Sequence, residues 1–259
     1  MDELKSTIAD LVLANRVLDR EGVMDAYGHV SVRHPTDPSR FLLSRSRSPA
    51  LIEEADIVEF NLDGEPVGPE ARPLYSERFI HAGVYAARSD VNAVVHSHAE
   101  DMLPFGISDV PLRAVIHSAS TMGAEIPVWD IRDKFGQTNL LVSNMAQARD
   151  LAGGLGQGTV VLMRGHGFVA AGRTLIECLR LAIDAPKNAR VLLAALLMGG
   201  RVTSLSNGEI DARRFDPQRP DKAKDYDPKG PGLGRAWEYW AHRVRGCQCQ
   251  CSQNEVRVD

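Results

Sequence analysis

The sequence lacks the features that direct a chain to membranes or to nucleic acid. Its longest apolar stretch, NARVLLAALLMGG, is far shorter than the roughly 20 residues that span a bilayer. The net charge of −4 is small and spread along the chain, which gives no basic surface for nucleic acid. The start, MDELKSTIAD, lacks the basic and apolar regions of a secretory signal. We therefore expect a cytoplasmic protein with no membrane or nucleic-acid partner.

Cysteine is also scarce, with 4 in 259 residues, which excludes a disulfide framework. Cys178 lies in a helical pattern, and the other three crowd into the stretch CQCQC near the end of the sequence. Hydrophobic residues make up 44% and charged residues 25% of the chain, as in ordinary globular proteins with a large core. A reducing compartment fits this usage of cysteine.

Periodicity in the sequence predicts alternating helices and strands. Residues 3–20 show apolar positions at helical spacing, and EGVMDAYGHVSVRHP then alternates, which predicts a half-buried strand through Val30 and Val32. Helices are expected from near Ser76 and from Thr174 to about Met198. Further strands are expected at FLLS, DIVEFNLDGEPV, VNAVVHSH and GTVVLMRGHG. This pattern predicts an α/β fold, a three-layer α/β/α sandwich around a mixed or antiparallel sheet.

The composition changes after about residue 205. Residues 1–205 are predicted to form one domain, to which the motifs described below assign metal binding and catalysis. Residues 206–246 start with a stretch rich in Asp, Pro, Lys and Gly, and RAWEYWAHRVR then predicts a short helix. We expect an arm over 206–246 and a disordered tail over 247–259.

Two histidines stand one residue apart in AVVHSHAED, at the end of an apolar run. Because side chains alternate between the faces of a strand, His96 and His98 point to the same face. A metal would bind both as neutral ligands, whereas two protonated imidazoles would repel each other. His166, between glycines in MRGHGFV, ends another apolar strand. Three histidines with an open fourth position are typical of a catalytic zinc-type site; the alternative is ordinary histidines at strand ends.

Glu77 in LYSERFIH lies at the start of a predicted helix, just after Pro73 and Ser76. A first-turn glutamate is typically a favourable partner of the helix dipole. The spacing of Glu77 to His81 also fits a pair of ligands on one helix face. A packed or solvated histidine is the alternative for His81, and equally for His34, His117 and His242.

The stretches EGVMDAYGHVSVR, LYSERFIHAGVYAARSDVNAVVHSHAE and RGHGFVAAG, in this order and spacing, resemble the class II aldolase and adducin family over about residues 5–205. The resemblance implies that His96, His98 and His166 are metal ligands. It implies that Glu77 is the general acid and base beside the metal. It also implies a homotetramer with sites near the subunit interfaces and a small-molecule substrate. The expected cofactor is one divalent metal ion per subunit, zinc first, with manganese, iron and cobalt as alternatives.

Three segments depart from the phosphate-binding motifs of the sugar-phosphate members of this family. The motif G-N-x-S is GHVS here, with His29 in place of asparagine; the T/S-G turn is LLSRSRSPA, without glycine; and S-S-E is YSE, with Tyr75. Glycine lets backbone N–H groups approach a phosphate, and bulkier side chains obstruct this approach. Arg45 and Arg47 instead offer guanidinium forks that suit a carboxylate, although a solvated basic loop is the alternative.

A fourth departure concerns the chemistry of the reaction. Family aldolases carry a proton-handling tyrosine near the position where this sequence continues Ser118-Ala119-Ser120 after AVIH. We therefore expect a metal-dependent lyase that decarboxylates a hydroxylated aromatic acid of the dihydroxybenzoate or dihydroxyphthalate type. The metal would hold two phenolic oxygens, and Glu77 would transfer a proton to the ring. The alternatives are an aldolase or epimerase acting on a sugar or sugar-phosphate-like substrate, and a non-catalytic scaffold of the adducin type.

The candidate substrate-binding residues surround these motifs. Arg45 or Arg47, together with His29, would hold the carboxylate. The segment WEYW over 237–240 is either an aromatic wall from a neighbouring subunit or part of a packing helix. The full candidate set is His29, Ser31, Ser44, Arg45, Arg47, Tyr75, Ser76 and His117.

Overall fold

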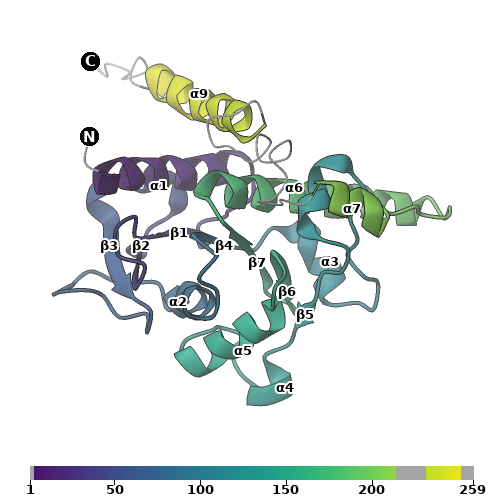
Figure 1. Ribbon diagram of the computed structural model, residues 1–259, viewed down its shortest axis with the longest axis horizontal. Helices are drawn as coiled ribbons and strands as arrows, with labels where there is room; N and C mark the ends of the chain where they lie inside the picture. Colours follow the sequence, from purple (N-terminus) through teal and green to yellow (C-terminus); the bar gives the residue numbers. More distant parts are fainter. Residues whose placement is uncertain (1–2, 214–231, 252–259) are drawn as a thin grey trace, which may run out of the picture.

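A computed structural model describes residues 3–213 and 232–251 of the chain. Within these residues, seven strands form one sheet in the order β3-β2-β1-β4-β7-β6-β5 (Figure 1). All neighbouring strands are antiparallel except β5 and β6, which are parallel. The sheet is therefore mixed, as predicted. The strands are β1 (His29–Arg33), β2 (Arg40–Ser44), β3 (Ile57–Asn61), β4 (Ala93–Ser97), β5 (Val128–Trp129), β6 (Val160–Met163) and β7 (Gly167–Gly172).

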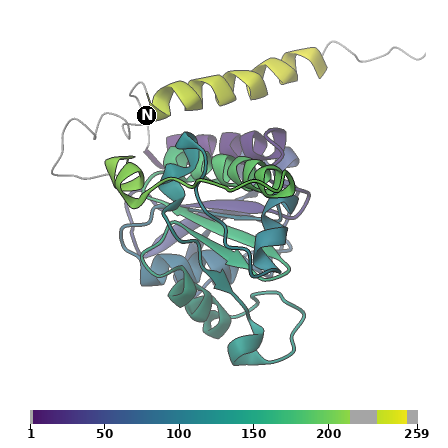
Figure 2. The same ribbon diagram turned by 90° about the vertical axis from the view of Figure 1, so that its right-hand side faces the viewer.

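Helices cover both faces of the sheet, which confirms the three-layer α/β/α architecture (Figure 2). One layer contains α1 (Glu3–Arg20) and α6 (Leu175–Leu197), with α9 (Leu233–Cys251) outside them. The other layer contains α2 (Arg78–Ala87) and α5 (Met145–Leu155). The short helices are α3 (Leu103–Gly106), α4 (Arg132–Phe135) and α7 (Asn207–Arg213).

Two hydrophobic cores lie on opposite faces of the sheet. Val30 and Val95 belong to the core beneath α1 and α6, and Val94 and Val169 belong to the core beneath α2 and α5. The prediction that β1 is half-buried was wrong, because every residue of the strand is buried. Polar and apolar residues alternate along β1 because its polar side chains point into the interior of the molecule rather than into water. These polar side chains contribute to the site described below.

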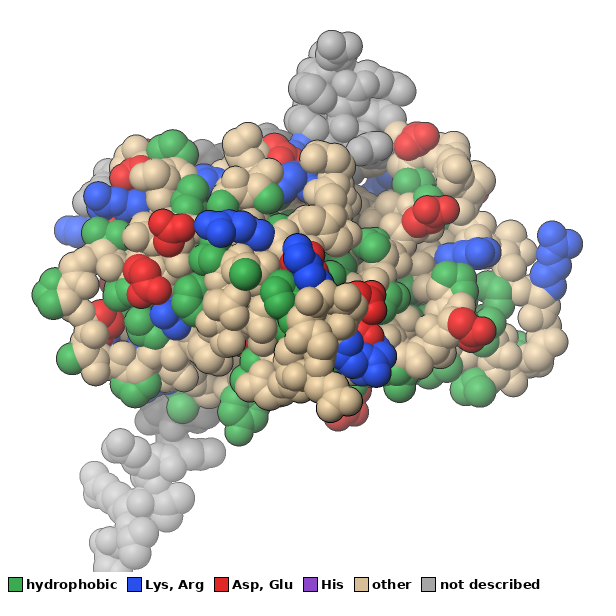
Figure 3. Space-filling model, turned by 90° about the horizontal axis from the view of Figure 1, so that it is seen from below, with side chains coloured by type: hydrophobic (Ala, Val, Ile, Leu, Met, Phe, Trp, Pro, Cys, Tyr) green, Lys and Arg blue, Asp and Glu red, His purple; other side chains and the backbone are tan. Residues whose placement is uncertain are grey.

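The helix α9 is longer than the short C-terminal helix that the sequence predicted, and it includes Cys247, Cys249 and Cys251. The remaining tail, 252–259, and part of the predicted arm, 214–231, lie outside the described residues. The domain boundaries therefore stay a prediction. None of the helices in the described ranges combines the length and apolar character that crossing a bilayer needs. On the face formed by α2 and α5, acidic and basic side chains are interspersed (Figure 3).

Candidate metal centre

The structure brings four side chains together at one end of the central strands β4 and β7. Glu77, His96, His98 and His166 each offer a ligand atom, and these atoms all lie within 4.8 Å of one another. His96 and His98 come from the end of the central strand β4 and its continuation, and His166 comes from the turn between β6 and β7. Because β7 pairs with β4, this turn lies beside the end of β4. The cluster unites residues that are up to 89 positions apart in the sequence.

Each histidine is oriented by an acceptor at Nδ1. The Nδ1 atom of His96 lies 3.1 Å from the carbonyl oxygen of Phe168, and that of His166 lies 3.1 Å from the carbonyl oxygen of Leu140. The Nδ1 atom of His98 lies 3.1 Å from Oδ2 of Asp25. Since a carbonyl or carboxylate only accepts, each neutral ring carries its proton on Nδ1. The lone pair of each ring is therefore on Nε2, which faces the cluster.

The arrangement of donor atoms fits a divalent metal. Nε2 of His96 lies 3.0 Å from Nε2 of His98, and Oε2 of Glu77 lies 3.6 Å from Nε2 of His96 and 3.4 Å from Nε2 of His166. Ligands at about 2.0–2.1 Å from a tetrahedral zinc ion are about 3.3–3.4 Å apart. Lone pairs at this spacing repel one another, and a cation between them removes the repulsion. Three imidazoles with carbonyl or carboxylate partners at the second nitrogen are typical of metal sites.

Glu77 is held in place by a backbone N–H from another part of the chain. It precedes the first residue of α2, and its Oε1 accepts a hydrogen bond from the Val142 N–H at 3.0 Å. Burial favours a raised pKa for Glu77, but His166 and His96, in their protonated forms, lower the pKa by more, so its net direction is downward. The carboxylate is thus ionised, as a metal ligand or a proton acceptor must be.

A cavity of about 810 Å³ opens onto this cluster. Four of the predicted substrate-binding residues line it: His29, Arg47, Tyr75 and Ser76. Arg47 shares the carboxylate of Asp56 through Nη1, at 2.6 Å, and its Nε and Nη2 make no hydrogen bond within the described chain. The Tyr75 hydroxyl donates to the carbonyl of Arg47 and so fixes the backbone at this residue. The cavity therefore offers a guanidinium group with free donors next to the four clustered side chains.

The other predicted substrate-binding residues do not line this cavity. Arg45 points to Asp56, with Nε 2.6 Å from Oδ1, and so supports the carboxylate that holds Arg47. Ser31 is buried behind His29, and Ser44 is buried in β2. His117 lines a separate cavity together with Arg180 and Asp184 on α6.

Sequence reasoning missed several residues that shape the site. Asp25 accepts hydrogen bonds from the N–H groups of Tyr27 and Gly28, a turn pattern that the letters DAYG permit but do not require. Leu140 adopts a left-handed φ of 67°, which is uncommon for any residue but glycine, asparagine or aspartate. No sequence signal marks that position. His81 was not missed: the sequence left a ligand or a packed histidine open, and the structure shows a fully buried ring that lies behind His29 and outside the cluster.

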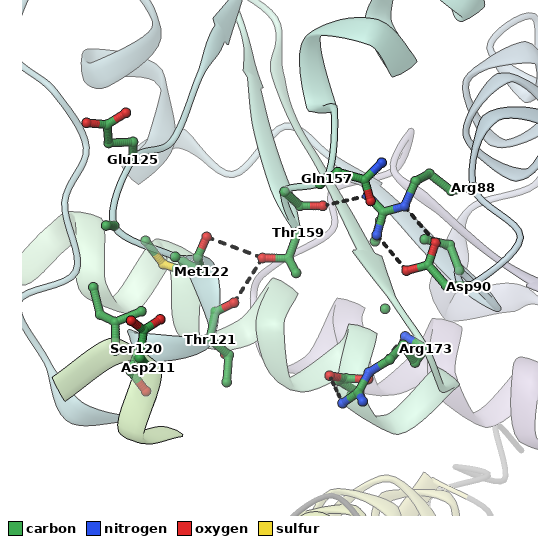
Figure 4. Close-up of a pocket in the computed structure, with 18 of the residues that line it drawn as sticks. Arg88, Asp90, Ser120, Thr121, Met122, Glu125, Gln157, Thr159, Arg173 and Asp211 are labelled. Carbon is green, nitrogen blue, oxygen red and sulfur yellow. Dashed lines mark hydrogen bonds and ion pairs between the residues drawn. The ribbon is translucent and has the colours of Figure 1, made fainter. Parts of the chain in front are cut away.

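A second cavity, of about 580 Å³, lies at the opposite end of β4 and β7 (Figure 4). Four of its charged side chains form two ion pairs: Arg88 binds Asp90 at 2.7 Å, and Arg173 binds Glu177 at 2.8 Å. The hydroxyl of Thr159 donates to the carbonyl of Thr121 at 2.9 Å. These contacts hold loops together, and the described residues that line this cavity form no cluster of metal ligands like that at Glu77.

Comparisons with known proteins agree with this geometry. A family model described as the Class II Aldolase and Adducin N-terminal domain matches residues 9–193. The chain is 32% identical over 243 residues to Decarboxylase tropJ of Talaromyces stipitatus, covering 88% of this chain and 90% of that protein. It is 28% identical over 210 residues to a 3,4-dihydroxyphthalate decarboxylase of Arthrobacter keyseri, covering 77% of this chain and 83% of that protein.

The fold also has solved counterparts. An aldolase II superfamily protein from Pseudomonas syringae superposes with a TM-score of 0.73 at 18% identity, covering 95% of each chain. At that identity the likeness concerns the fold alone. The family model, by contrast, spans well over half of the sequence and includes all four clustered side chains. The chain therefore belongs to the class II aldolase and adducin family.

Proposed function

We propose that this protein is a divalent-metal-dependent decarboxylase that acts on an ortho-dihydroxylated aromatic acid of the dihydroxybenzoate or dihydroxyphthalate type. The observation that carries the proposal is the cluster of Glu77, His96, His98 and His166, of which all but the buried His96 line a cavity that is also lined by Arg47. Relatives named as decarboxylases, one of them for 3,4-dihydroxyphthalate, support the choice of reaction. The intact cluster argues against a non-catalytic scaffold.

The metal would be held by the Nε2 atoms of the three histidines. When bound, it would act as a Lewis acid that polarises two neighbouring phenolic oxygens of the substrate and stabilises the charge that develops on the ring. Zinc is the first choice for three imidazoles and a carboxylate, and manganese, iron and cobalt remain alternatives.

Glu77 would move the proton. Its ionised carboxylate accepts the proton of a substrate hydroxyl, and the Val142 N–H keeps the carboxylate in place. When the bond between ring and carboxyl carbon breaks, its electron pair stays on the ring and carbon dioxide leaves. Glu77 then gives the proton to that ring carbon and returns to its ionised form.

Arg47 would bind the substrate carboxylate. Nε and Nη2 lie on one edge of a guanidinium group and can donate two parallel hydrogen bonds to a carboxylate. Nη1 is already held by Asp56, which fixes the plane of the group. Arg45, on the other oxygen of Asp56, would support Arg47 rather than contact the substrate.

Carbon dioxide release tests this proposal. The protein, stripped of metal and reloaded with zinc, manganese or cobalt, is given 3,4-dihydroxyphthalate, 2,3-dihydroxybenzoate and the dimethoxy analogue of each. We expect release from a dihydroxy acid with metal only, and none from the methoxy compounds. Cleavage of sugar phosphates without any carbon dioxide release would favour the aldolase alternative. A protein that binds no divalent metal would refute both.

The expected homotetramer is part of the same proposal. Sedimentation of the purified protein gives its mass directly, and a mass near four times 28.3 kDa is expected. A monomer that is fully active would refute the proposal of a tetramer with its sites near the subunit interfaces.

A further inference from the structure

A chain of four hydrogen-bonded side chains runs from the interior to the cavity. The Tyr85 hydroxyl lies 2.8 Å from the Ser31 hydroxyl, which lies 2.6 Å from Nδ1 of His81. Nε2 of His81 then lies 2.6 Å from Nδ1 of His29. All four residues are buried, and His29 is the member that lines the cavity.

Which group donates each of these hydrogen bonds follows from Tyr85, the innermost of the four residues. Among the described residues, Ser31 is the only hydrogen-bond acceptor that the Tyr85 hydroxyl reaches. A buried hydroxyl that fails to donate loses much of its solvation energy, so Tyr85 donates to Ser31. Ser31 then has its own hydrogen left for Nδ1 of His81.

The same logic sets the tautomers of both histidines. Burial lowers the pKa of His81 to about 3, so its ring is neutral and has one N–H. Since Nδ1 of His81 accepts from Ser31, its hydrogen is on Nε2 and is donated to Nδ1 of His29. His29 therefore has its hydrogen on Nε2, the ring nitrogen that does not face His81.

We propose that His29 binds the substrate carboxylate through a neutral Nε2–H, and that His81, Ser31 and Tyr85 are positioning residues that fix this tautomer. The inference rests on the proposed function for the identity of the bound group. A neutral donor accepts no proton from the substrate and stabilises a carboxylate without a second full charge beside the metal. The opposite tautomer would present a lone pair and repel that carboxylate.

The hydrogen-bonded side chains behind His29 therefore determine which chemical group can bind on this side of the cavity. An oxygen that accepts a hydrogen bond is favoured there, and a group that can only donate is rejected because His29 offers it no acceptor. Arg47 and His29 would then hold the carboxylate from two sides, with Tyr75 packed against His29 at a ring distance of 4.6 Å.

Two-bond ¹H–¹⁵N correlation spectra of the ¹⁵N-labelled, zinc-loaded protein test the tautomers directly. Spectra of His29→Gln and His81→Gln assign the two rings. Both rings are expected to show a protonated Nε2 and an unprotonated Nδ1. A protonated Nδ1 on His29 would overturn the proposal. This readout needs no turnover, so it fails or succeeds independently of the decarboxylase assay.

Binding measurements test the consequence. Tyr85→Phe and His81→Phe are titrated with 3,4-dihydroxybenzoate and with catechol, which lacks the carboxylate. Loss of an oriented donor to a charged group is expected to weaken the binding of 3,4-dihydroxybenzoate by about tenfold to a hundredfold. The affinity for catechol should stay unchanged. Equal weakening of both ligands, or of neither, would overturn the proposal.

A matched control separates orientation from general damage. Thr159→Val removes a side-chain hydrogen bond at the second cavity, at the far end of the sheet (Figure 4). It should leave the binding of both ligands as in the unmodified protein. Metal content is measured for every variant, and only those with full zinc loading are compared.

Discussion

Gly167 is the point at which the two metal-binding segments touch. It follows His166 directly, and a methyl group at its Cα would overlap the carbonyl oxygen of Ser97. The same methyl group would lie 3.1 Å from the carbonyl carbon of Ser97 and 3.2 Å from Cα of His98. All three neighbours are backbone atoms of β4 and its continuation, the segment that carries His96 and His98, so no side chain can rotate away.

The substitution Gly167→Ala should therefore separate His166 from the other two histidines. Relief of the overlap needs a shift of about 1 Å, because non-bonded atoms settle at about 3.5 Å. Metal sites tolerate only about 0.2 Å in ligand distance. We expect metal affinity to fall by about tenfold to a hundredfold or more. Overpacking should also cost about 1–3 kcal/mol of stability, or about 2–12 °C in melting temperature.

Gly172→Ala is the matched control at the other end of β7. A methyl group there would lie 2.7 Å from the backbone nitrogen of Cys178, far from the histidines. We expect a similar loss of melting temperature but full metal content, measured by mass spectrometry of the bound metal and by thermal unfolding. If Gly167→Ala binds metal as tightly as the unmodified protein, or if Gly172→Ala loses metal equally, the steric argument is wrong.

Three further predictions follow from the site. Glu77→Gln should lower kcat by about 10²- to 10⁴-fold while the three histidines retain metal, as measured by carbon dioxide release and metal analysis; unchanged turnover would exclude Glu77 from proton transfer. Arg47→Ala should raise KM by about tenfold to a hundredfold, and Arg45→Ala should raise it less; if neither changes KM, the carboxylate is bound elsewhere. Burial favours a raised pKa for Asp56, but the Glu53 N–H and the two guanidinium groups outweigh it, so the pKa lies below its usual value. Its contribution to stability is therefore full above the pKa of the unfolded chain, about 4, and is lost as pH falls further. Thermal unfolding between pH 6 and 3 should show this loss in the unmodified protein and a smaller one in Asp56→Asn.

The sequence was sufficient to predict the layers, the mixed sheet and the shared face of His96 and His98. These features depend on local periodicity, and a two-residue period places both side chains on one face of β4 whatever the rest of the chain does. The burial of both faces of β1 was not predictable in this way. The side chains of His29 and Ser31 are polar, and only the tertiary fold shows that they bond to other buried groups.

Partners distant in sequence could not be predicted from the letters. Arg45 and Arg47 are equivalent in the sequence, and the structure distinguishes them because Asp56 binds both while only Arg47 lines the cavity. Leu140 and Val142 contact His166 and Glu77 because of where the loop that contains them passes the ends of the strands. No motif in the loop marks that path.

The backbone of the segment Leu140–Val142 forms hydrogen bonds with two members of the cluster. The Leu140 carbonyl accepts from His166, and the Val142 N–H donates to Glu77. Any ion that draws His166 and Glu77 to one point also holds this segment, and the coupling is reciprocal. The left-handed backbone of Leu140 stores strain that favours release once those contacts loosen. The amide hydrogen of Val142 is therefore an internal reporter, whose exchange with solvent should slow as the site fills with metal, before any substrate is added.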